Sequence, residues 1–368
     1  MQKLPIGIQT FKGLREDGYL YVDKTEVIYN LVQEAKVYFL SRPRRFGKSL
    51  LCSTLKAYFE GNKELFKGLA IEKLETEWTA YPVLYFDFNG EKYNSAEYLE
   101  KMLDRHISQW EEIYGCVNPN ETISGRFYNI VIRAHEQMGK RVVVIVDEYD
   151  KPLLETFDND TVIEQSRTLF KGFFGNLKKL DEHLKFVFFT GVTKFSKVSI
   201  FSDLNQLFDI SLDMRYETIC GISKDELLRD FTEHITAMAE HNKISYDECV
   251  ALLKKYYDGY HFSENMTDMF NPFSILNALA SKTFKFFWFA TGTPTFLVKR
   301  LNAIENEIDF KELSKGVSVT IGEITDYRPD NPNIIPLLYQ SGYLTIRDFD
   351  ALSQIYVLTY PNKVCASW

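Results

Sequence analysis

The 368-residue sequence is poor in the residues that build metal sites and disulfide frameworks. Its five cysteines are scattered without a Cys-x-x-Cys pair, and its six histidines include no His-Glu-x-x-His motif. Such spacings are the usual signs of zinc sites and redox or structural disulfides. We therefore expect reduced thiols, as in a cytoplasmic protein, and no zinc site.

Long apolar runs are also missing. The nearest candidate, residues 284–290, is far shorter than the roughly 20 residues that a membrane helix needs. The first residues, Met-Gln-Lys-Leu-Pro, do not resemble the apolar part of a signal peptide. The sequence therefore predicts a cytoplasmic protein without a membrane partner.

Positive charge is in short supply as well. The net charge is −8 and the isoelectric point is near 5.5. Affinity for nucleic acid comes largely from neutralising phosphates, so this balance argues against a protein that mainly wraps DNA or RNA. A local basic patch stays compatible with the composition, and nucleic acid is kept as a weakly supported partner.

Apolar residues, in contrast, are ample for two or three domains, at 45% of the chain. Five apolar runs predict strands, and two long stretches between them, 94–114 and 121–138, have helical spacing. The strands are expected at residues 37–41, 83–88, 142–147, 185–190 and 208–212. Strands that are apolar throughout and separated by helices predict an α/β fold with a parallel sheet covered on both faces.

The pattern changes near residue 215. Helical spacing follows over 223–240 and 246–257, and Asn-Pro and Thr-Pro pairs predict helices over 271–279 and 293–301. Short apolar runs near the end, 344–346 and 355–358, suggest strands. We expect a nucleotide-binding-type domain at 1–215, a compact helical domain of winged-helix type at 216–305, and a mixed tail at 306–368.

A Gly-Lys-Ser loop follows the first predicted strand and opens an amphipathic helix. Strand, tight turn, Gly-Lys-Ser and helix together build a phosphate cradle, in which backbone N–H groups face the phosphates. Lys48 would neutralise the terminal phosphates and the Ser49 hydroxyl would reach a bound Mg²⁺. The predicted nucleotide-binding residues are Arg44, Arg45, Phe46, Gly47, Lys48 and Ser49.

The loop is degenerate, because Arg42 stands where the usual G-x-x-x-x-G-K-[ST] pattern has its first glycine. Pro43 stiffens the loop instead. Arg42, Arg44 and Arg45 could each contact phosphate, and a solvated basic surface is the equally balanced alternative.

Two carboxylates end the third predicted strand. Asp147 could hold Mg²⁺ through water, and Glu148 could orient and deprotonate the water that attacks the γ-phosphate. Thr190, at the end of the fourth strand, has the polar character of a γ-phosphate sensor, although an ordinary turn threonine is as good an account. Lys194 is a weaker candidate, and Asp150 is expected to be structural.

At this point the sequence resembles the predicted AAA-ATPase-like family, which is abundant in gut and anaerobic bacteria. Seven motifs carry the resemblance in order: residues 21–25, 42–49, 146–150, 190–194, 199–205, 257–260 and 271–274. The resemblance implies a P-loop ATPase of the additional-strand, catalytic-glutamate type, with sheet order 5-1-4-3-2 and a helical, winged-helix-like domain behind it. The family's loop also lacks the first glycine.

By the same resemblance, Lys48, Ser49, Asp147 and Glu148 match the family's nucleotide and magnesium positions. Members often carry a C-terminal restriction-endonuclease-like domain. Residues 340–346 and 360–362 resemble the entry to it, so we expect that domain to be absent or truncated in this chain.

The predicted function is an ATP-binding, Mg²⁺-dependent, ATP-hydrolysing switch with a protein partner that the sequence does not identify. One alternative is a non-enzymatic interaction protein that binds nucleotide as a structural ligand. Another is the motor part of a nucleic-acid-processing system.

Overall fold

The computed structural model describes residues 1–90, 92–194, 207–288, 297–298, 301, 310–325 and 333–367. Contacts divide the chain into two compact units. The sheet unit comprises Ile28–Leu40 and Thr54–Asp209, and the loop unit comprises Met1–Val27, Ser41–Ser53 and Ile210–Trp368. The domain boundaries predicted from the sequence, 1–215, 216–305 and 306–368, stay predictions.

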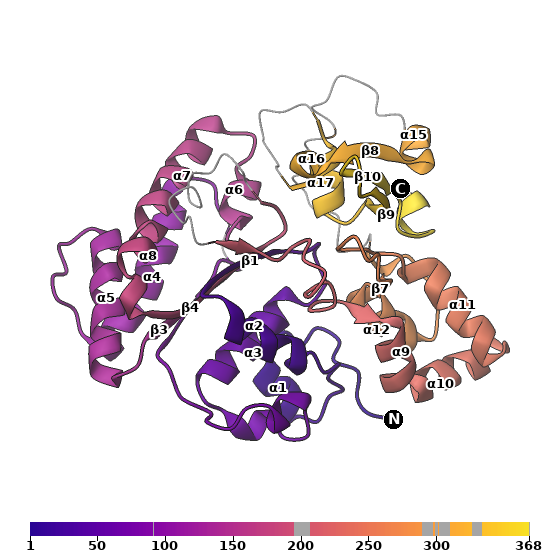
Figure 1. The fold of residues 1–368 in the computed structure, drawn as a ribbon, viewed down its shortest axis with the longest axis horizontal. Coiled ribbons are helices and arrows are strands. Elements are labelled where there is room, and N and C mark those ends of the chain that lie inside the picture. The colour runs from indigo at the N-terminus through magenta and orange to yellow at the C-terminus, as the bar shows by residue number, and fades with distance from the viewer. Residues whose placement is uncertain are drawn as a thin grey trace. The chain divides into compact units, whose positions relative to one another are not determined.

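A five-stranded sheet forms the centre of the sheet unit, in the order β2-β3-β4-β1-β5 (Figure 1). The strands are β1 Val37–Ser41, β2 Val83–Asp87, β3 Val142–Asp147, β4 Leu184–Gly191 and β5 Phe208–Asp209. The pairs β2–β3, β3–β4 and β1–β5 run parallel. The predicted α/β fold and the order 5-1-4-3-2 are confirmed, and β4 lies between β1 and β3.

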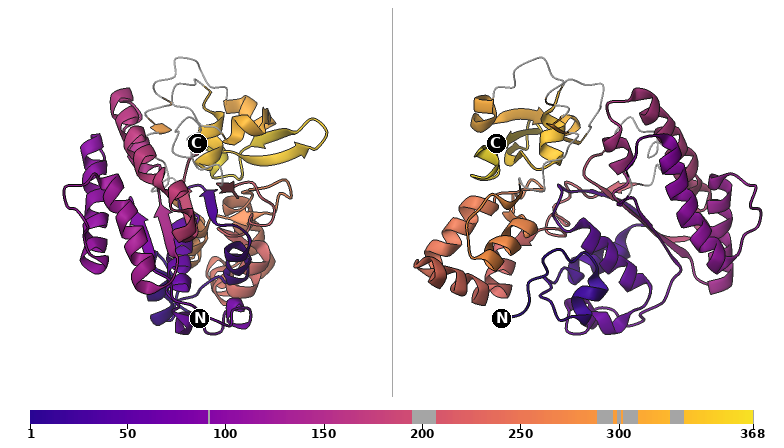
Figure 2. Two further views of the ribbon diagram at one scale, coloured as in Figure 1. Left: turned by 60° about the vertical axis from the view of Figure 1, so that its left-hand side comes forward. Right: turned by 180° about the vertical axis from the view of Figure 1, so that it is seen from behind.

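Apolar side chains cover both faces of this sheet. On one face, the Phe86 ring of β2 contacts the Trp110 and Phe127 rings, at centroid distances of 4.7 and 5.7 Å. On the other face, Phe59 lies 4.9 Å from Phe186 of β4. Figure 2 shows the helices on both sides of the strands. A strand buried on both faces needs apolar residues throughout, which explains the continuous apolar run of β3.

Two helices of the sheet unit match the predicted positions, whereas α7, the 15-residue helix Asp160–Phe174, was not predicted. The two long ones, expected at 94–114 and 121–138, are α4 and α5. Elements that lie wholly in this unit are η1 Lys63–Phe66, η2 Ala70–Lys73, α4 Ala96–Tyr114, α5 Ile123–Met138, α6 Lys151–Glu155, α7 Asp160–Phe174, α8 Asn176–Lys179 and η3 Asp181–His183. Two further helices, α2 Thr25–Glu34 and α3 Lys48–Phe59, continue from the loop unit into this one.

Strand β5 is shorter than predicted, because only Phe208 and Asp209 pair with β1. Beyond them, the Ser211 hydroxyl accepts a hydrogen bond from the Ser41 N–H at 2.8 Å. A side chain therefore takes the place of the strand ladder, and the predicted strand over 208–212 ends early.

Within the loop unit, the region from Ile222 to Ser281 is mainly helical. Its elements are α9 Lys224–Asp230, α10 Thr232–Asn242, α11 Tyr246–Tyr257 and α12 Pro272–Ser281, with a ribbon of β6 Ile222–Ser223 and β7 Met269–Phe270. The single helix predicted over 223–240 is two helices, because the buried Phe231 leaves helical geometry at φ −118°. Asn271 caps α12 with Pro272 at its first position, as predicted. Near the N-terminus, the unit also contains α1 Phe11–Glu16.

The last part of the chain contains a three-stranded antiparallel sheet, in the order β8-β10-β9. The two short strands predicted near the end are present as β9 and β10. The elements are α15 Phe310–Lys315, β8 Val317–Thr320, α16 Ile321–Thr325, α17 Ile335–Gln340, β9 Thr345–Asp350, β10 Ile355–Thr359 and η4 Cys365–Ser367. The helix predicted from Thr293 and the motif at 199–205 fall mostly or wholly outside the residues described.

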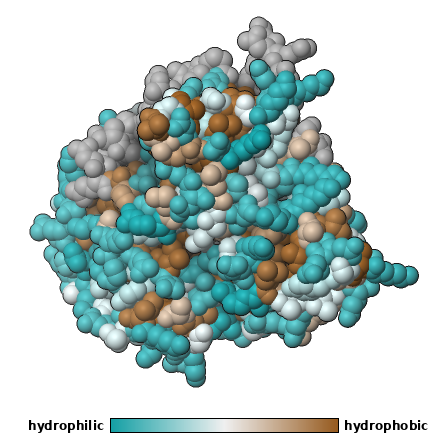
Figure 3. All heavy atoms as spheres, turned by 45° about the vertical axis from the view of Figure 1, so that its right-hand side comes forward, coloured by the Kyte–Doolittle hydropathy of each residue, from teal (hydrophilic) through white to brown (hydrophobic). Residues whose placement is uncertain are grey.

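Within the part of the chain that the structure describes, no helix combines the length and apolar character needed to cross a bilayer. On the face drawn in Figure 3, hydrophilic side chains separate the apolar patches from one another.

Candidate nucleotide site

The predicted phosphate loop leaves β1 and leads directly into α3, which begins at Lys48. Two of its residues adopt the left-handed conformation: Arg45 at φ +71° and Gly47 at φ +92°. Gly47 has open space where a Cβ would lie, so its glycine is favoured by the backbone angle and not by crowding. A non-glycine residue in this region costs about 1 kcal/mol or more, so the loop's surroundings must hold Arg45 in place.

Lys48 lies under its own loop. Its ammonium donates hydrogen bonds to the carbonyls of Arg42 at 2.9 Å and Pro43 at 3.1 Å, and the residue is only 4% exposed. The residues on either side of Lys48 are more accessible to solvent: Gly47 is exposed and Ser49 is partly exposed. The loop therefore closes around the lysine while leaving the start of α3 accessible.

The Arg42 side chain lies inside the protein, so the alternative of a solvated basic surface is wrong for this residue. Its guanidinium is buried, donates to the carbonyls of Ser41, Ser211 and Tyr216 at 2.7–3.2 Å, and stacks 4.3 Å from the Phe262 ring. A planar guanidinium with several fixed donors suits such a site. Arg42 thus stabilises the loop from inside the protein, at the position where other phosphate loops have a glycine.

Phe46 anchors the loop from its other end. Its ring is buried against Tyr260 and Phe262, at centroid distances of 4.9 and 5.2 Å. The Gly221 N–H donates to its carbonyl at 3.1 Å. Since the ring packs inward, any contact of Phe46 with a nucleotide would have to come from its backbone N–H.

The two predicted arginines of the loop have different surroundings. Arg44 is partly buried, whereas Arg45 is exposed. The Arg45 guanidinium lies 5.0 Å from the ring of Phe273, within cation–π distance.

In the sheet unit, the predicted carboxylates end strand β3. Asp147 is buried and pairs in register with Asp87 of β2, and the Tyr85 hydroxyl lies 3.4 Å from its Oδ2 atom. Glu148 is partly exposed and has a left-handed φ of +52°. This turn directs the next residue back toward β4, where the Tyr149 N–H donates to the Thr190 carbonyl at 3.1 Å.

Thr190 lies on β4, beside the end of β3. It is fully buried, and its hydroxyl has no hydrogen-bond partner among the residues that the structure describes. A buried hydroxyl without a partner is unusual in a folded protein. This favours the sensor interpretation over that of an ordinary turn threonine.

The prediction that Asp150 is structural is consistent with its contacts. Its carboxylate accepts hydrogen bonds from the N–H groups of Val192 and Thr193 and from the Thr193 hydroxyl, at 2.6–2.9 Å. Lys194 is engaged as well, in an ion pair of 2.6 Å with Asp209.

The predicted site residues thus form two sets. Asp147, Glu148 and Thr190 lie together at the ends of β3 and β4 in the sheet unit, and residues 44–49 form the loop in the loop unit. Over the described ranges, no group of three or more His, Cys, Asp or Glu side chains is arranged to hold a metal ion by itself. The predicted Mg²⁺ ligands, Ser49 and Asp147, belong to different units and stay a prediction.

Several residues that shape the loop had no signal in the sequence. Ser211, Tyr216 and Gly221 act through backbone groups, which every residue type offers. Only Gly221 carries a hint, because its φ of +93° favours glycine.

Comparison with known proteins identifies the family of this chain. A family model described as "Predicted AAA-ATPase" matches residues 5–201, just over half of the chain. The chain belongs to the predicted AAA-ATPase family. This AAA-ATPase-like chain is also 36% identical over 365 residues to an Azotobacter chroococcum mcd 1 protein described as "Uncharacterized protein in vnfD 5'region". That alignment covers 98% of this chain and 68% of the Azotobacter protein.

Among solved structures, this AAA-ATPase-like chain has a distant likeness to the Aeropyrum pernix ORC2 protein in its ADPNP–ADP complexes. The sequence identity is 11% and the TM-score is 0.32, with 99% of this chain and 95% of the other covered. A likeness at this level does not bear on function.

Proposed function

We propose that this AAA-ATPase-like chain binds ATP with Mg²⁺ and hydrolyses it, and that the hydrolysis acts as a switch. The observation that carries the proposal is the phosphate loop, with Lys48 held under two loop carbonyls at the start of α3. In the sheet, β4 lies between β1, which leads into the loop, and β3, which ends in the two carboxylates. This is the strand order that the family resemblance implied.

Each residue has a chemical role in this proposal. The backbone N–H groups of residues 44–49 and the Lys48 ammonium would bind the phosphates. Ser49 and Asp147 would hold Mg²⁺, which neutralises charge on the transferred phosphoryl group. Glu148 would orient and deprotonate the attacking water, and the Thr190 hydroxyl would contact the γ-phosphate or that water.

Binding is tested first with Lys48→Ala. We expect the affinity for ATP with Mg²⁺ to fall at least about tenfold, because a buried ammonium that pairs with phosphate is lost. Isothermal titration calorimetry measures it. Lys56→Ala is the matched control, since Lys56 lies on the same helix in a partly exposed ion pair with Glu60. Equal affinities for Lys48→Ala and the wild type would contradict the loop assignment.

Hydrolysis is tested with Glu148→Gln. The variant should bind ATP with unchanged affinity and release phosphate at least about 100-fold more slowly, because glutamine cannot take the proton. The exposed Glu136 on α5 provides the control variant, Glu136→Gln. Normal turnover by Glu148→Gln would show that another group is the base.

The alternative function, binding without hydrolysis, is favoured by the degenerate first position of the loop. It predicts that ATP raises thermal stability while the wild-type protein releases no phosphate. The same calorimetric and phosphate assays therefore separate the two functions.

We also propose that the winged-helix-like part lies at 310–359, later than the sequence suggested. Helix, strand, two helices and two strands follow one another there, with a three-stranded antiparallel sheet. Its last helix, α17, is apolar and largely buried, and the β9–β10 turn carries no basic residue but a 98% exposed Leu352. These features favour a protein partner over nucleic acid, since phosphate contacts need basic side chains.

The cytoplasm remains the proposed location. The five cysteines form no disulfide with one another, as expected of thiols in that compartment.

A further inference from the structure

We infer that Lys24 and Glu226 are positioning residues of the phosphate loop, which act on it through the β6–β7 ribbon. The motif around Lys24, residues 21–25, has no role in the proposed hydrolysis. The effect on nucleotide affinity rests on the proposed function, whereas the effect on the loop's backbone does not.

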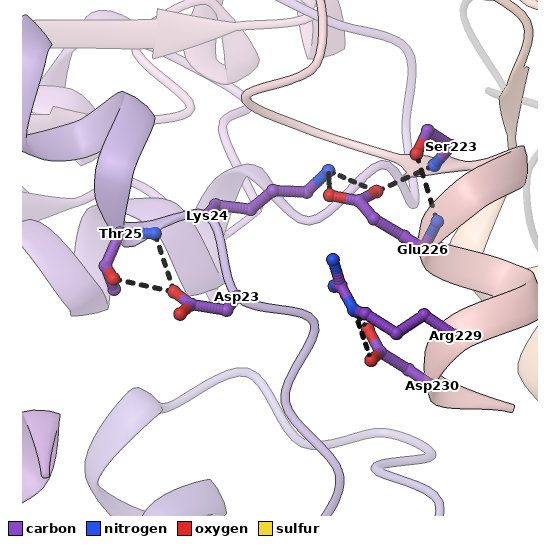
Figure 4. A network of polar contacts seen from close by, with 7 residues as sticks. All are labelled: Asp23, Lys24, Thr25, Ser223, Glu226, Arg229 and Asp230. Atoms are coloured by element: carbon purple, nitrogen blue, oxygen red, sulfur yellow. Dashed lines mark hydrogen bonds and ion pairs between the residues drawn. The ribbon is translucent and has the colours of Figure 1, made fainter. Parts of the chain in front are cut away.

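Lys24 and Glu226 form a nearly buried ion pair, shown in Figure 4. The Lys24 ammonium lies 2.6 Å from both carboxylate oxygens of Glu226, and the two side chains are only 10% and 13% exposed. Next to Lys24, the Asp23 carboxylate accepts hydrogen bonds from the N–H and hydroxyl of Thr25, the first residue of α2. The backbone on both sides of Lys24 is therefore well fixed.

The same Glu226 carboxylate also holds the end of strand β6. It accepts a hydrogen bond from the Ser223 N–H at 2.7 Å, while the Ser223 hydroxyl accepts one from the Glu226 N–H at 3.3 Å. This reciprocal pair is a capping box at the start of α9. Ser223 is also the last residue of β6, so Lys24 is connected to the ribbon through one carboxylate.

The ribbon contacts the phosphate loop through the residue just before β6, because the Gly221 N–H donates to the Phe46 carbonyl. The neighbouring loop residue is contacted by the helix that follows β7, where Phe273 of α12 lies 5.0 Å from the Arg45 guanidinium. Gly221 lies close to both partners, since a Cβ there would come within 3.0 Å of the Met269 side chain and 3.4 Å of the Phe46 ring.

Removing Lys24 would leave the nearly buried Glu226 carboxylate without its hydrogen-bonded cation, which is unfavourable. The only other cation drawn beside it in Figure 4, Arg229, is 58% exposed and pairs with Asp230. We expect Glu226 to turn toward water and release the Ser223 N–H. The ribbon would then no longer hold Gly221 against Phe46. Lys48 is not touched by this change, because it bonds to the carbonyls of Arg42 and Pro43.

The test uses the full chain and the variants Lys24→Met, Lys24→Arg and Glu226→Gln. Amide hydrogen exchange is measured for the segments 44–50 and 219–224, and affinity is measured with ADP and Mg²⁺. For Lys24→Met we expect faster exchange in these two segments and about tenfold weaker ADP binding, because small displacements of binding groups are costly. Lys24→Arg should restore both properties, and Glu226→Gln should reproduce the loss in part.

The matched control is Lys254→Met, which removes the 2.7 Å ion pair with Asp268 elsewhere in the loop unit. It should leave exchange in 44–50 unchanged. The inference is overturned if Lys24→Met exchanges like the wild type in both segments, or if exchange rises equally in α10 and α11. If Lys24→Met does not fold, the same criteria apply to Glu226→Gln. Should the wild type bind no ADP, the proposed function fails, and the exchange data still decide the positioning role.

Discussion

Asp258 is a carboxyl group in an almost fully buried position at the end of α11, with 2% of its surface exposed. Burial raises its pKa to about 7, and the nearby Asp268 carboxylate adds to that rise. Lys254, at 3.9 Å, and His261 oppose the rise without cancelling it.

This pKa has a consequence for stability. The folded protein holds the Asp258 proton more tightly than the unfolded chain, whose aspartates have a pKa of about 3.9. The contribution of Asp258 to stability therefore falls as the pH rises from about 4 to 7, by about 4 kcal/mol at most.

We expect Asp258→Asn to remove this pH dependence and to raise stability above pH 7. Urea unfolding at pH 5 and pH 8 measures the difference between the variant and the wild type. Asp225→Asn, at an exposed position of α9, should leave the wild-type slope in place. An identical slope in Asp258→Asn would show that Asp258 does not titrate in this range.

At the scale of single elements, helix caps offer a clear test. Ser245 begins α11 with a capping box, in which its hydroxyl accepts from the Glu248 N–H and the Glu248 carboxylate accepts from the Ser245 N–H. Ser245→Ala should destabilise the protein by about 1 kcal/mol. The control is Ser281→Ala at the far end of α12, where the hydroxyl bonds to the Asn277 carbonyl and the Thr283 hydroxyl and caps no helix N-terminus. Equal losses in urea unfolding would contradict a specific capping effect.

Elements whose residues are buried on both faces could be predicted well from the sequence. Strands β1 and β3 have the predicted bounds, because an unbroken apolar run that short fits a covered parallel strand. Helical spacing did not reveal the break at Phe231, since an apolar residue at that position suits a continuous helix equally well. The end of β5 was missed because the Ser211 side chain, and not a strand neighbour, bonds to Ser41.

The residues of the candidate site could likewise be predicted only in part from the sequence. Gly47, Lys48, Ser49, Asp147 and Glu148 could be predicted because their chemistry depends on residue type. The residues that support the loop could not be predicted. They bond to Arg42 through the backbone carbonyls of Ser211 and Tyr216, and every residue type has such a carbonyl. Arg42 was therefore taken as a possible phosphate ligand, although its partners are backbone oxygens.

For the whole molecule, nucleotide binding should appear as a gain in stability. A ligand at 100 times its dissociation constant stabilises the folded state by about 2.7 kcal/mol. ATP with Mg²⁺ should therefore raise the apparent melting temperature of the wild type in a thermal-shift assay, and Lys48→Ala should show a clearly smaller rise, since a tenfold weaker affinity leaves about 1.4 kcal/mol of stabilisation at the same ATP concentration. An equal rise in both proteins would mean that the nucleotide binds elsewhere.

The long-range support of the phosphate loop bears on how the protein is made. Arg42 and Phe46 find most of their partners far along the chain, some 170 to 220 residues further on, at Ser211, Tyr216, Gly221, Tyr260 and Phe262. During synthesis, the nascent chain must extend past Gly221 before its loop can close. A fragment that stops at residue 201, where the family match ends, would carry every signature residue from Lys48 to Thr190 and still be unable to build the cradle.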